Sequence, residues 1–179
     1  MKIVTLSGSL RARSANAAVL RTALDVSGAP ARAAEIGALP HFNPDDDGEG
    51  AVPPPPVAAL RSAVADADAV LIVSPEYARG VPGVLKNALD WLVSSGEFVG
   101  KPVAVITASP MPAGGDQANT QLCGTLAMMT AEVVAEACLC VGLVAAKLDG
   151  TADRVTDEPT VEALTAAMAA LRKAVPGAA

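Results

Sequence analysis

The stretch KIVTLSGSLRARSAN, residues 2–16, joins an apolar run to a polar loop. The run KIVTLS is rich in β-branched and aliphatic residues with little polar alternation, which predicts a strand buried on both faces. After the loop GSLRARSAN, apolar residues recur at helical spacing: Val19, Leu20, Ala23 and Leu24. Gly28 follows and favours the end of that helix. A buried strand that leads directly into a helix is the repeating unit of a parallel α/β sheet.

The same unit returns further along the chain. DAVLIVS (68–74) and KPVAVITAS (101–109) are again short apolar runs, and each is followed by a turn rich in proline or glycine and then by a helical pattern. ARAAEIGAL (31–39) predicts a weaker strand, and AEVVAEACLCVGL (131–143) predicts a last strand with an irregular segment. About five strands therefore alternate with five helices, which predicts an open parallel sheet covered on both faces.

Two helix starts can be placed from local signals. The four prolines at 53–56 precede a helical pattern, and because proline is tolerated in the first helical turn, we expect them to begin a helix. The alternative is that the prolines form a polyproline II segment to which another protein binds. Asp157 offers an N-cap for a C-terminal helix, whose buried stripe is Val161, Leu164, Met168 and Leu171.

Composition limits the class of protein. The chain has 179 residues and a net charge of −6, with only 2% aromatic residues. An acidic chain without a basic stripe is disfavoured as a nucleic-acid binder. The apolar runs are too short for a signal peptide core or a membrane span, so we expect no membrane association and a cytoplasmic location.

The cysteines and the histidine predict no metal site. Cys123, Cys138 and Cys140 form no C-x-x-C motif, and their odd number argues against a disulfide framework. We expect all three to be buried apolar side chains. His41 lies in an acidic loop, where metal binding with Asp45–Asp47 is the weaker alternative.

Three loops should meet at the carboxyl ends of the parallel strands, where ligands of such sheets bind. The first, residues 8–16, has neither G-x-G-x-x-G nor a nucleotide triphosphatase P-loop. It does place serine and asparagine donors with Arg11 and Arg13 at the start of a helix, which favours an anion such as a phosphate. The alternative is that Ser14 only caps the helix. Of the two arginines, we expect Arg11 to be the ligand and Arg13 to be solvated.

The second and third loops suit a planar ring. Pro75 imposes extended geometry on the residue before it, and Gly80 and Gly83 can supply positive φ or a close approach to a ligand. Tyr77 could add an aromatic face. Glu76 is either a solvated carboxylate or, as the weaker alternative, a catalytic acid. The third loop contributes Ser109 and the glycine pair Gly114 and Gly115 as a wall.

The chain carries no Ser-His-Asp set and no G-x-S-x-G nucleophile elbow. We therefore assign no residue a catalytic role, and any chemistry would come from a cofactor.

Two motifs together resemble the NAD(P)H-dependent FMN reductase family, which includes chromate, quinone and azo reductases. They are SGSLRARSAN (7–16) and SPEYARGVPGVLKNALDWL (74–92), and the third loop has the family's ASP…GG order. The resemblance spans nearly the whole chain. It implies a flavodoxin-like three-layer α/β/α sandwich, formed by residues 1–179 as a single domain, with a five-stranded parallel sheet in the order 2-1-3-4-5.

The resemblance also implies non-covalent FMN with NAD(P)H as co-substrate. Hydride would pass from NAD(P)H to the flavin, and electrons would then pass to a quinone, free flavin, azo compound or metal oxyanion in a ping-pong cycle. By position, the phosphate would lie among Ser9, Arg11, Ser14, the Ala15 amide and Asn16. Pro75, Glu76 and Tyr77 would border the isoalloxazine, largely through backbone groups, and Ser109, Gly114 and Gly115 would close the other side. Family members are usually dimers or tetramers, so we expect a homodimer or homotetramer.

Two departures from the family pattern bear on binding. The family commonly reads PEYN followed by a small residue, and this chain has Ala78 and Arg79 there. Loss of the asparagine could weaken a flavin contact, whereas Arg79 could add a cation near the phosphates of the nicotinamide nucleotide. The family's Arg-Ala-Gln after the glycine pair is replaced by residues 117–119, Gln-Ala-Asn, which makes a dimer the firmer expectation than a tetramer.

Two alternatives belong to other classes. A flavodoxin-like electron carrier would bind FMN without a nicotinamide site, and its acidic docking surface is compatible with the net charge. Such carriers have phosphate loops without arginine, so Arg11 and Arg13 favour the enzyme. A flavin-free interaction subunit is the third possibility, and Ala78 leaves it open.

Overall fold

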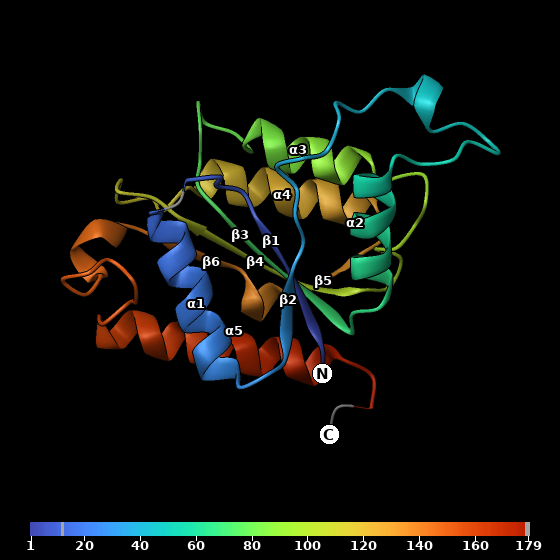
Figure 1. The fold of residues 1–179 in the computed structure, drawn as a ribbon. Helices are drawn as coiled ribbons and strands as arrows, with labels where there is room; N and C mark the ends of the chain where they lie inside the picture. Colours follow the sequence, from blue (N-terminus) through green and yellow to red (C-terminus); the bar gives the residue numbers. More distant parts are fainter. Residues whose placement is uncertain (12, 178–179) are drawn as a thin grey trace.

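A parallel sheet runs through the middle of the molecule (Figure 1). The structure is a computed structural model that describes residues 1–11 and 13–177. The strands are β1 (Ile3–Ser7), β2 (Ala31–Ala33), β3 (Ala69–Ser74), β4 (Pro102–Ala108), β5 (Glu132–Val133) and β6 (Leu139–Val141). Their order is β2-β1-β3-β4-β5, and β6 also pairs with β4. The predicted order 2-1-3-4-5 and the flavodoxin-like class are confirmed.

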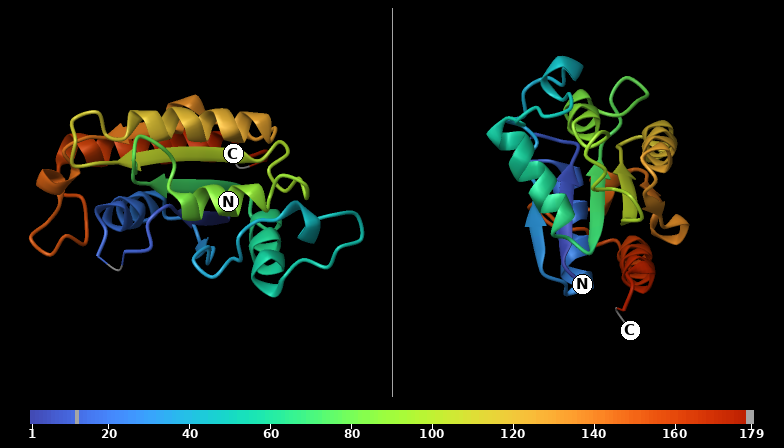
Figure 2. Two further views of the ribbon diagram at one scale, coloured as in Figure 1. Left: turned by 90° about the horizontal axis from the view of Figure 1, so that it is seen from above. Right: turned by 90° about the vertical axis from the view of Figure 1, so that its right-hand side faces the viewer.

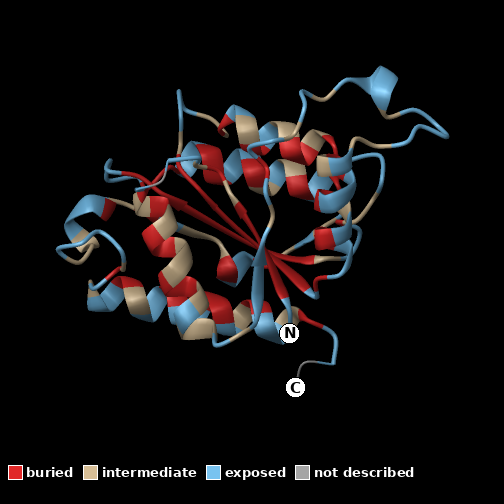
Figure 3. Cartoon of the chain, viewed as in Figure 1, coloured by how far each residue is buried: buried red, intermediate tan, exposed pale blue. Residues whose placement is uncertain are grey.

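Helices cover both faces of the sheet. The helices α1 (Ala15–Ser27) and α5 (Glu158–Ala174) lie on one face, while α2 (Pro55–Ala65), α3 (Gly83–Asp90) and α4 (Asp116–Met128) lie on the other (Figures 1 and 2). Alternate residues of β4 enter separate cores: Ala104 and Ile106 pack towards α1 and α5, and Val103 and Val105 towards the other three helices. Every residue of β3 and β4 is buried, as expected for strands covered on both sides (Figure 3).

The register of the central strands brings their carboxyl ends level. Ser7 of β1 pairs with Val73 of β3, and Ser74 of β3 pairs with Thr107 of β4. The three loops that follow these strands therefore leave the sheet side by side. This register is what allows residues distant in the sequence to form one site.

The predicted helix ends are confirmed. Gly28 ends α1 in the left-handed region at φ 59°, and its N–H returns to the carbonyls of Leu24 and Asp25. The Asp157 carboxylate accepts the Thr160 N–H at 3.2 Å at the start of α5. The proline run does begin a helix, since α2 starts at Pro55.

The second strand is shorter than predicted. Only Ala31–Ala33 pair with β1, and all three residues are exposed. The Ala34 N–H donates to the Thr5 carbonyl at 3.0 Å. Beyond this residue the chain turns away from the sheet, and Ile36 is buried in the core beside α2 and α3. Burial of Ile36 therefore takes precedence over continuation of an edge strand that has only one neighbour.

The predicted last strand is split in two, so the described sheet has six strands where five were predicted. The strands β5 and β6 both pair with β4, and a short 3₁₀ helix, η2 (Ala135–Ala137), separates them. The Asn119 side chain of α4 spans the gap, because its Nδ2 donates to the Val105 and Leu139 carbonyls, each at 3.2 Å. The amide thus supplies hydrogen bonds at the break in the ladder, where a buried carbonyl would otherwise be unpaired.

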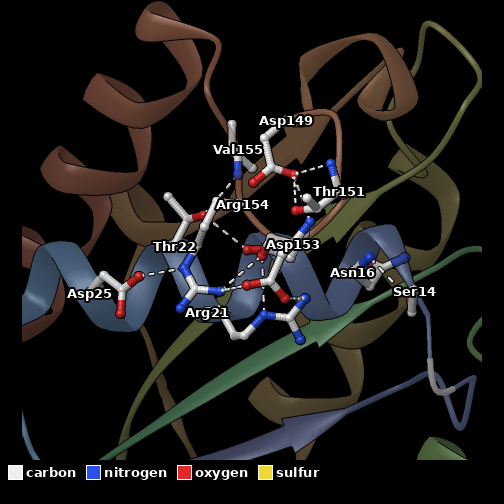
Figure 4. Close-up of polar contacts among 11 residues, drawn as sticks. Ser14, Asn16, Arg21, Thr22, Asp25, Asp149, Thr151, Asp153, Arg154 and Val155 are labelled. Carbon is white, nitrogen blue, oxygen red and sulfur yellow. Dashed lines mark hydrogen bonds and ion pairs between the residues drawn. The ribbon is translucent and has the colours of Figure 1, made fainter.

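A loop after β6 holds α1 in place. Its two ends meet in an antiparallel bridge between Leu148 and Val155, and the Val155 N–H donates to Thr22 Oγ1 of α1 at 3.0 Å (Figure 4). Two exposed ion pairs, Arg154 with Asp25 and Arg21 with Asp153, connect the same elements. Exposed pairs contribute little each, so the buried Thr22 contact is the firmer anchor.

No helix in the described part of the chain is both long and apolar enough to cross a membrane.

Candidate active site

The loops after β1, β3 and β4 converge on one open pocket of about 350 Å³. The predicted site residues that line it are Ser9, Arg11, Ser14, Ala15, Asn16, Pro75, Glu76, Tyr77 and Ser109. Residues separated by about a hundred positions in the sequence thus share one cavity at the carboxyl edge of the sheet, where parallel α/β proteins bind ligands.

The first loop depends on a glycine at its first position. The Gly8 N–H donates to the Val73 carbonyl at 2.9 Å, which extends the pairing of β1 with β3 by one bond. A Cβ atom on Gly8 would lie 2.2 Å from Ser74 Oγ, closer than any side chain tolerates. The absence of a side chain lets the loop cross the end of β3 and bring Ser9 and Arg11 to the pocket.

Ser14 caps α1, as one reading of the sequence proposed. Its Oγ accepts the Asn16 N–H at 3.2 Å, and its backbone is extended with φ −124° and ψ 133°. Ser9 Oγ likewise accepts the Arg11 N–H, at 3.4 Å. Because both oxygens act as acceptors, each hydroxyl can still donate its own hydrogen. Capping by Ser14 and anion binding at the helix start are therefore compatible.

Asn16 has a buried acceptor that needs a donor. The side chain is 6% exposed, and its Nδ2 donates to the Ala108 carbonyl at 3.1 Å. Among the buried side-chain nitrogen and oxygen atoms of the described residues, Asn16 Oδ1 alone has no hydrogen-bond partner. Leaving a buried acceptor unpaired is costly, and Asn16 lines the pocket, so a donor on a ligand would satisfy it.

The Glu76 side chain caps a helix. Its Oε2 accepts the Ala118 N–H at 3.0 Å, in the first turn of α4. Gly115 occupies the N-cap position of α4 and has no side chain to offer, so the carboxylate from the β3 loop takes that role. Both sequence interpretations, a solvated carboxylate and a catalytic acid, missed this contact.

The glycine pair lies behind the pocket wall. Gly114 has φ +67°, and a Cβ there would lie 2.6 Å from the Cys140 carbonyl carbon. Gly115 has φ +85°, with Glu76 Cβ and Thr107 Cβ each 3.3 Å from the place of its missing Cβ. The pair therefore sets the path of the third loop, and Ser109 is the predicted residue of that loop that reaches the pocket.

Ala78 and Arg79 lie in a tight turn beside the pocket. Both residues have positive φ, 50° and 62°, and the turn is closed by two hydrogen bonds between the backbones of Tyr77 and Gly80. Of the two roles suggested for Gly80 and Gly83, positive φ is not used, because neither glycine has it and the left-handed pair is Ala78 and Arg79. Ala78 lines a separate groove between α3 and α4, and Tyr77 borders both hollows.

The structure adds pocket residues that the sequence analysis did not select: Ala108, Pro110, Met111 and Val144. The first three flank Ser109 in the chain, so their inclusion follows from the loop itself. Val144 belongs to a 3₁₀ segment after β6 and has no sequence signal, but its N–H donates to the Ser109 carbonyl at 3.1 Å.

The cysteines are more accessible than predicted. Cys140 is exposed, while Cys123 and Cys138 are half-buried and all three are free thiols. The expectation of three buried cysteines was wrong, because Cys123 and Cys138 pack only partly against the core and Cys140 is exposed. His41 is exposed, and residues 1–11 and 13–177 contain no cluster of histidine, cysteine and carboxylate side chains suited to a metal ion.

Known proteins are similar to this chain in sequence and architecture. The profile of the NADPH-dependent FMN reductase family matches residues 1–146. A quinone reductase of Escherichia coli K12 is 36% identical over 178 residues, covering 95% of this chain and 93% of the relative. An NAD(P)H-dependent FMN reductase of Pseudomonas aeruginosa is 38% identical over 133 residues, covering 72% and 71%.

Among solved structures, FerB, a flavoenzyme NAD(P)H:(acceptor) oxidoreductase of Paracoccus denitrificans, superimposes with a TM-score of 0.76 at 28% identity, covering 95% of this chain and 94% of the other. The sheet order, the convergent loops and the family match agree. The chain therefore belongs to the NADPH-dependent FMN reductase family and is an oxidoreductase that uses FMN and NAD(P)H.

Proposed function

We propose that FMN binds in the pocket formed by the loops after β1, β3 and β4, and that the enzyme passes electrons from NAD(P)H to a quinone. The observation that carries the proposal is the unpaired buried Asn16 Oδ1 in a pocket that also holds Arg11 and the start of α1. Free flavin, azo compounds and metal oxyanions remain further acceptors of the same open site. The quinone is favoured because the Escherichia coli relative is named a quinone reductase.

The phosphate end of FMN is assigned to the first loop. Arg11 is exposed at the pocket edge and supplies the positive charge. Ser9 and Ser14 supply hydroxyl donors, and the first turn of α1, from Ala15 onwards, supplies backbone N–H groups and the positive end of the helix dipole. This combination neutralises a phosphate locally although the chain as a whole carries a charge of −6.

Asn16 is assigned to the sugar-alcohol chain next to the phosphate. An ionised phosphate only accepts hydrogen bonds, so it cannot satisfy Asn16 Oδ1. A hydroxyl group of the ribityl chain can donate to it. We therefore keep Asn16 in the site and assign its amide oxygen to the ribityl hydroxyl. Its Nδ2 is already bonded to the Ala108 carbonyl.

The ring end is assigned to the second and third loops. The Glu76 carboxylate is bonded to α4, so residues 75–77 are left to meet the ring through backbone groups and the Tyr77 side chain. Ser109 and Met111 form the opposite side, and Gly114 and Gly115 fix the path of their loop from behind. The exposed Tyr77 and Met111 side chains lie where substrates would enter.

FMN, when bound, supplies the chemistry by accepting a hydride from NAD(P)H and releasing electrons to the acceptor. The chain positions the substrates. Arg79 is exposed in the turn after Tyr77, and we assign it to the phosphates of the nicotinamide nucleotide. The hydrogen bond from Gln121 Nε2 to the Arg79 carbonyl, 3.1 Å, holds that turn against α4.

The test is a spectroscopic titration of the purified protein. After addition of FMN, the flavin should bind, NADPH or NADH should bleach it in the absence of oxygen, and 1,4-benzoquinone should restore its colour at once. Failure to bind FMN would remove the site. Binding without bleaching by either nucleotide would indicate an electron carrier, and bleaching without reoxidation by the quinone would indicate another acceptor.

We further propose that residues 1–179 act as one FMN-binding domain, that the protein is cytoplasmic, and that it forms a homodimer or a homotetramer. The free thiols suit a reducing compartment. The groove between α3 and α4 supports self-association, because Val93 and Met128 are 45% and 61% exposed there and Tyr77 joins it to the site. Sedimentation should give the mass of two or four chains.

A further inference from the structure

Two cysteines that the proposed function does not use lie side by side. Cys123 is in α4, and Cys138 lies between η2 and β6. Their Sγ atoms are 3.8 Å apart. Cys123 comes from a helix that covers the sheet and Cys138 from the break in the last strand, so the contact is made by the fold and not by neighbouring positions in the chain.

Each sulfur of the pair also lies near a hydrogen-bond acceptor of the protein. Cys123 Sγ is 3.6 Å from Asn119 Oδ1, and Cys138 Sγ is 3.4 Å from the Val134 carbonyl. Both side chains are half-buried, so part of each is open to solvent. Cys140 differs from this pair, because its side chain is exposed and its sulfur accepts a hydrogen bond from Thr107 Oγ1 at 3.6 Å.

We propose that Cys123 and Cys138 form a redox pair that a small hydroperoxide, such as hydrogen peroxide, closes to a disulfide. The proposal does not depend on FMN binding, because it rests on the two sulfur atoms and their access. It assigns a modification site to the interrupted edge of the sheet. Closure joins α4 covalently to the segment between β5 and β6.

The reaction balances in two steps. The Cys138 thiolate attacks one peroxide oxygen, the O–O bond breaks, and the departing hydroxide takes a proton to leave as water, so that Cys138 becomes a sulfenic acid. The Cys123 sulfur then attacks the Cys138 sulfur. The S–S bond forms, the S–O bond breaks, and the hydroxide leaves as a second water with the Cys123 proton. Two thiols have lost two electrons, and the peroxide has gained them.

The geometry permits closure with a small local movement. A disulfide has its sulfur atoms ~2.05 Å apart, so the pair must approach by about 1.7 Å from 3.8 Å. Cys138 lies between elements of three residues each, η2 and β6, which can shift more easily than a long helix. The Asn119 bonds to Val105 and Leu139 keep the segment on the sheet while it moves.

Electrostatics give the two cysteines different roles. The hydrogen bond from the Cys123 thiol lowers the pKa of Cys138 to about 7, with a smaller contribution from the Val105 backbone, while burial and the Glu136 charge oppose it. The pKa of Cys123 is raised, first by the same hydrogen bond and then by burial and the charges of Cys138 and Cys140. Cys138 is therefore the thiolate that attacks first.

The first experiment counts thiols in the FMN-loaded full chain after exposure to hydrogen peroxide without NADPH. Free thiols should fall from three per chain to one, a peptide linking positions 123 and 138 should appear in the mass spectrum, and a dithiol reductant should restore all three. Cys140→Ser, as control, should fall from two thiols to none. Three surviving thiols, a sulfinic acid on Cys138, or disulfides between chains through Cys140 would overturn the proposal.

A second experiment tests the assignment of Cys138 as the attacking thiolate. Its alkylation by iodoacetamide is followed by peptide mass spectrometry over a range of pH. The rate should reach half its plateau near pH 7 in the unaltered chain, move to higher pH in Cys123→Ala, and return towards pH 7 in Cys123→Ser, whose hydroxyl restores a donor. If Cys123→Ala had the same midpoint as the unaltered chain, the assignment of Cys138 would be contradicted. Disulfide formation is tested separately, by the thiol count on the unaltered chain.

Discussion

Arg11 and Arg13 are separated by one residue, yet their surroundings differ. Arg11 lines the pocket, whereas Arg13 is exposed away from it. Loss of one charge-assisted hydrogen bond costs about 1.5–3 kcal/mol. We therefore expect Arg11→Ala to weaken FMN binding roughly ten- to a hundredfold and Arg13→Ala to change it by less than about twofold. Flavin fluorescence titration measures both.

Repeating the titrations at high ionic strength distinguishes a direct contact with FMN from long-range charge attraction, because salt screens only the latter strongly. If both arginines act only through their charge at long range, the two variants lose equal affinity and the loss vanishes at high ionic strength. That result would remove Arg11 from the phosphate site. Retention of the difference between the variants at high salt is the expected outcome.

At the scale of the element, the turn from Tyr77 to Gly80 carries two residues that disfavour its conformation. Ala78 and Arg79 both have positive φ, and such a pair in a two-residue hairpin turn favours asparagine, aspartate or glycine. Ala78→Asn should therefore raise the stability by about 1 kcal/mol, or the melting temperature by roughly 2–4 °C. Ala78→Val should lower it, because β-branched residues fit positive φ poorly. Thermal unfolding of the two variants gives the sign, and equal melting temperatures would show that the turn is not strained.

The elements that sequence predicted best are those whose surroundings are uniform. The strands β1, β3 and β4 are covered on both faces, so their apolar runs mark them directly. The edge strands were predicted poorly because their surroundings are not uniform. In β2 three exposed residues pair on one side only, and the break between β5 and β6 depends on Asn119, whose partner Leu139 is 20 residues further along the chain.

The candidate pocket was predictable in its location and less so in its contacts. Parallel strands end on one edge, so the three loops had to meet once their strands were recognised. The bond from Ala118 to Glu76 spans 42 residues, and Asn16 reaches Ala108 across 92. Contacts of this range depend on how the loops pack, which no local pattern encodes.

At the scale of the molecule, two aspartates with lowered pKa values should make the stability decrease in acid. The pKa of Asp157 is held below its usual 3.8, first by the Thr160 hydroxyl and then by the Thr160 N–H and Lys147, against some desolvation. Burial tends to raise the pKa of Asp47, but Ser94 and Arg61 outweigh it and lower the pKa. Because these values lie below that of the unfolded chain, the stabilisation is complete above about pH 4 and is lost as the pH falls through the folded-state values.

Asp157→Asn tests this expectation, because asparagine can still cap α5 but does not titrate. The melting temperature of this variant should fall less than that of the unaltered chain between about pH 5 and pH 3. Asp45→Asn removes the same charge from an exposed position in the short 3₁₀ helix η1 (Pro44–Asp46) and should follow the unaltered chain. Identical acid profiles for all three proteins would contradict the role of Asp157.

The short strands at the two borders of the sheet disfavour pairing between the sheets of two chains when the protein is concentrated. One border is β2, three exposed residues with Arg32 at its centre, and the other is split into β5 and β6 by η2. A strand from a second chain would find no long row of open backbone groups to join at either border. Fibril-like stacking of sheets is thereby discouraged, and any contact between copies is left to the outer surfaces of the helices.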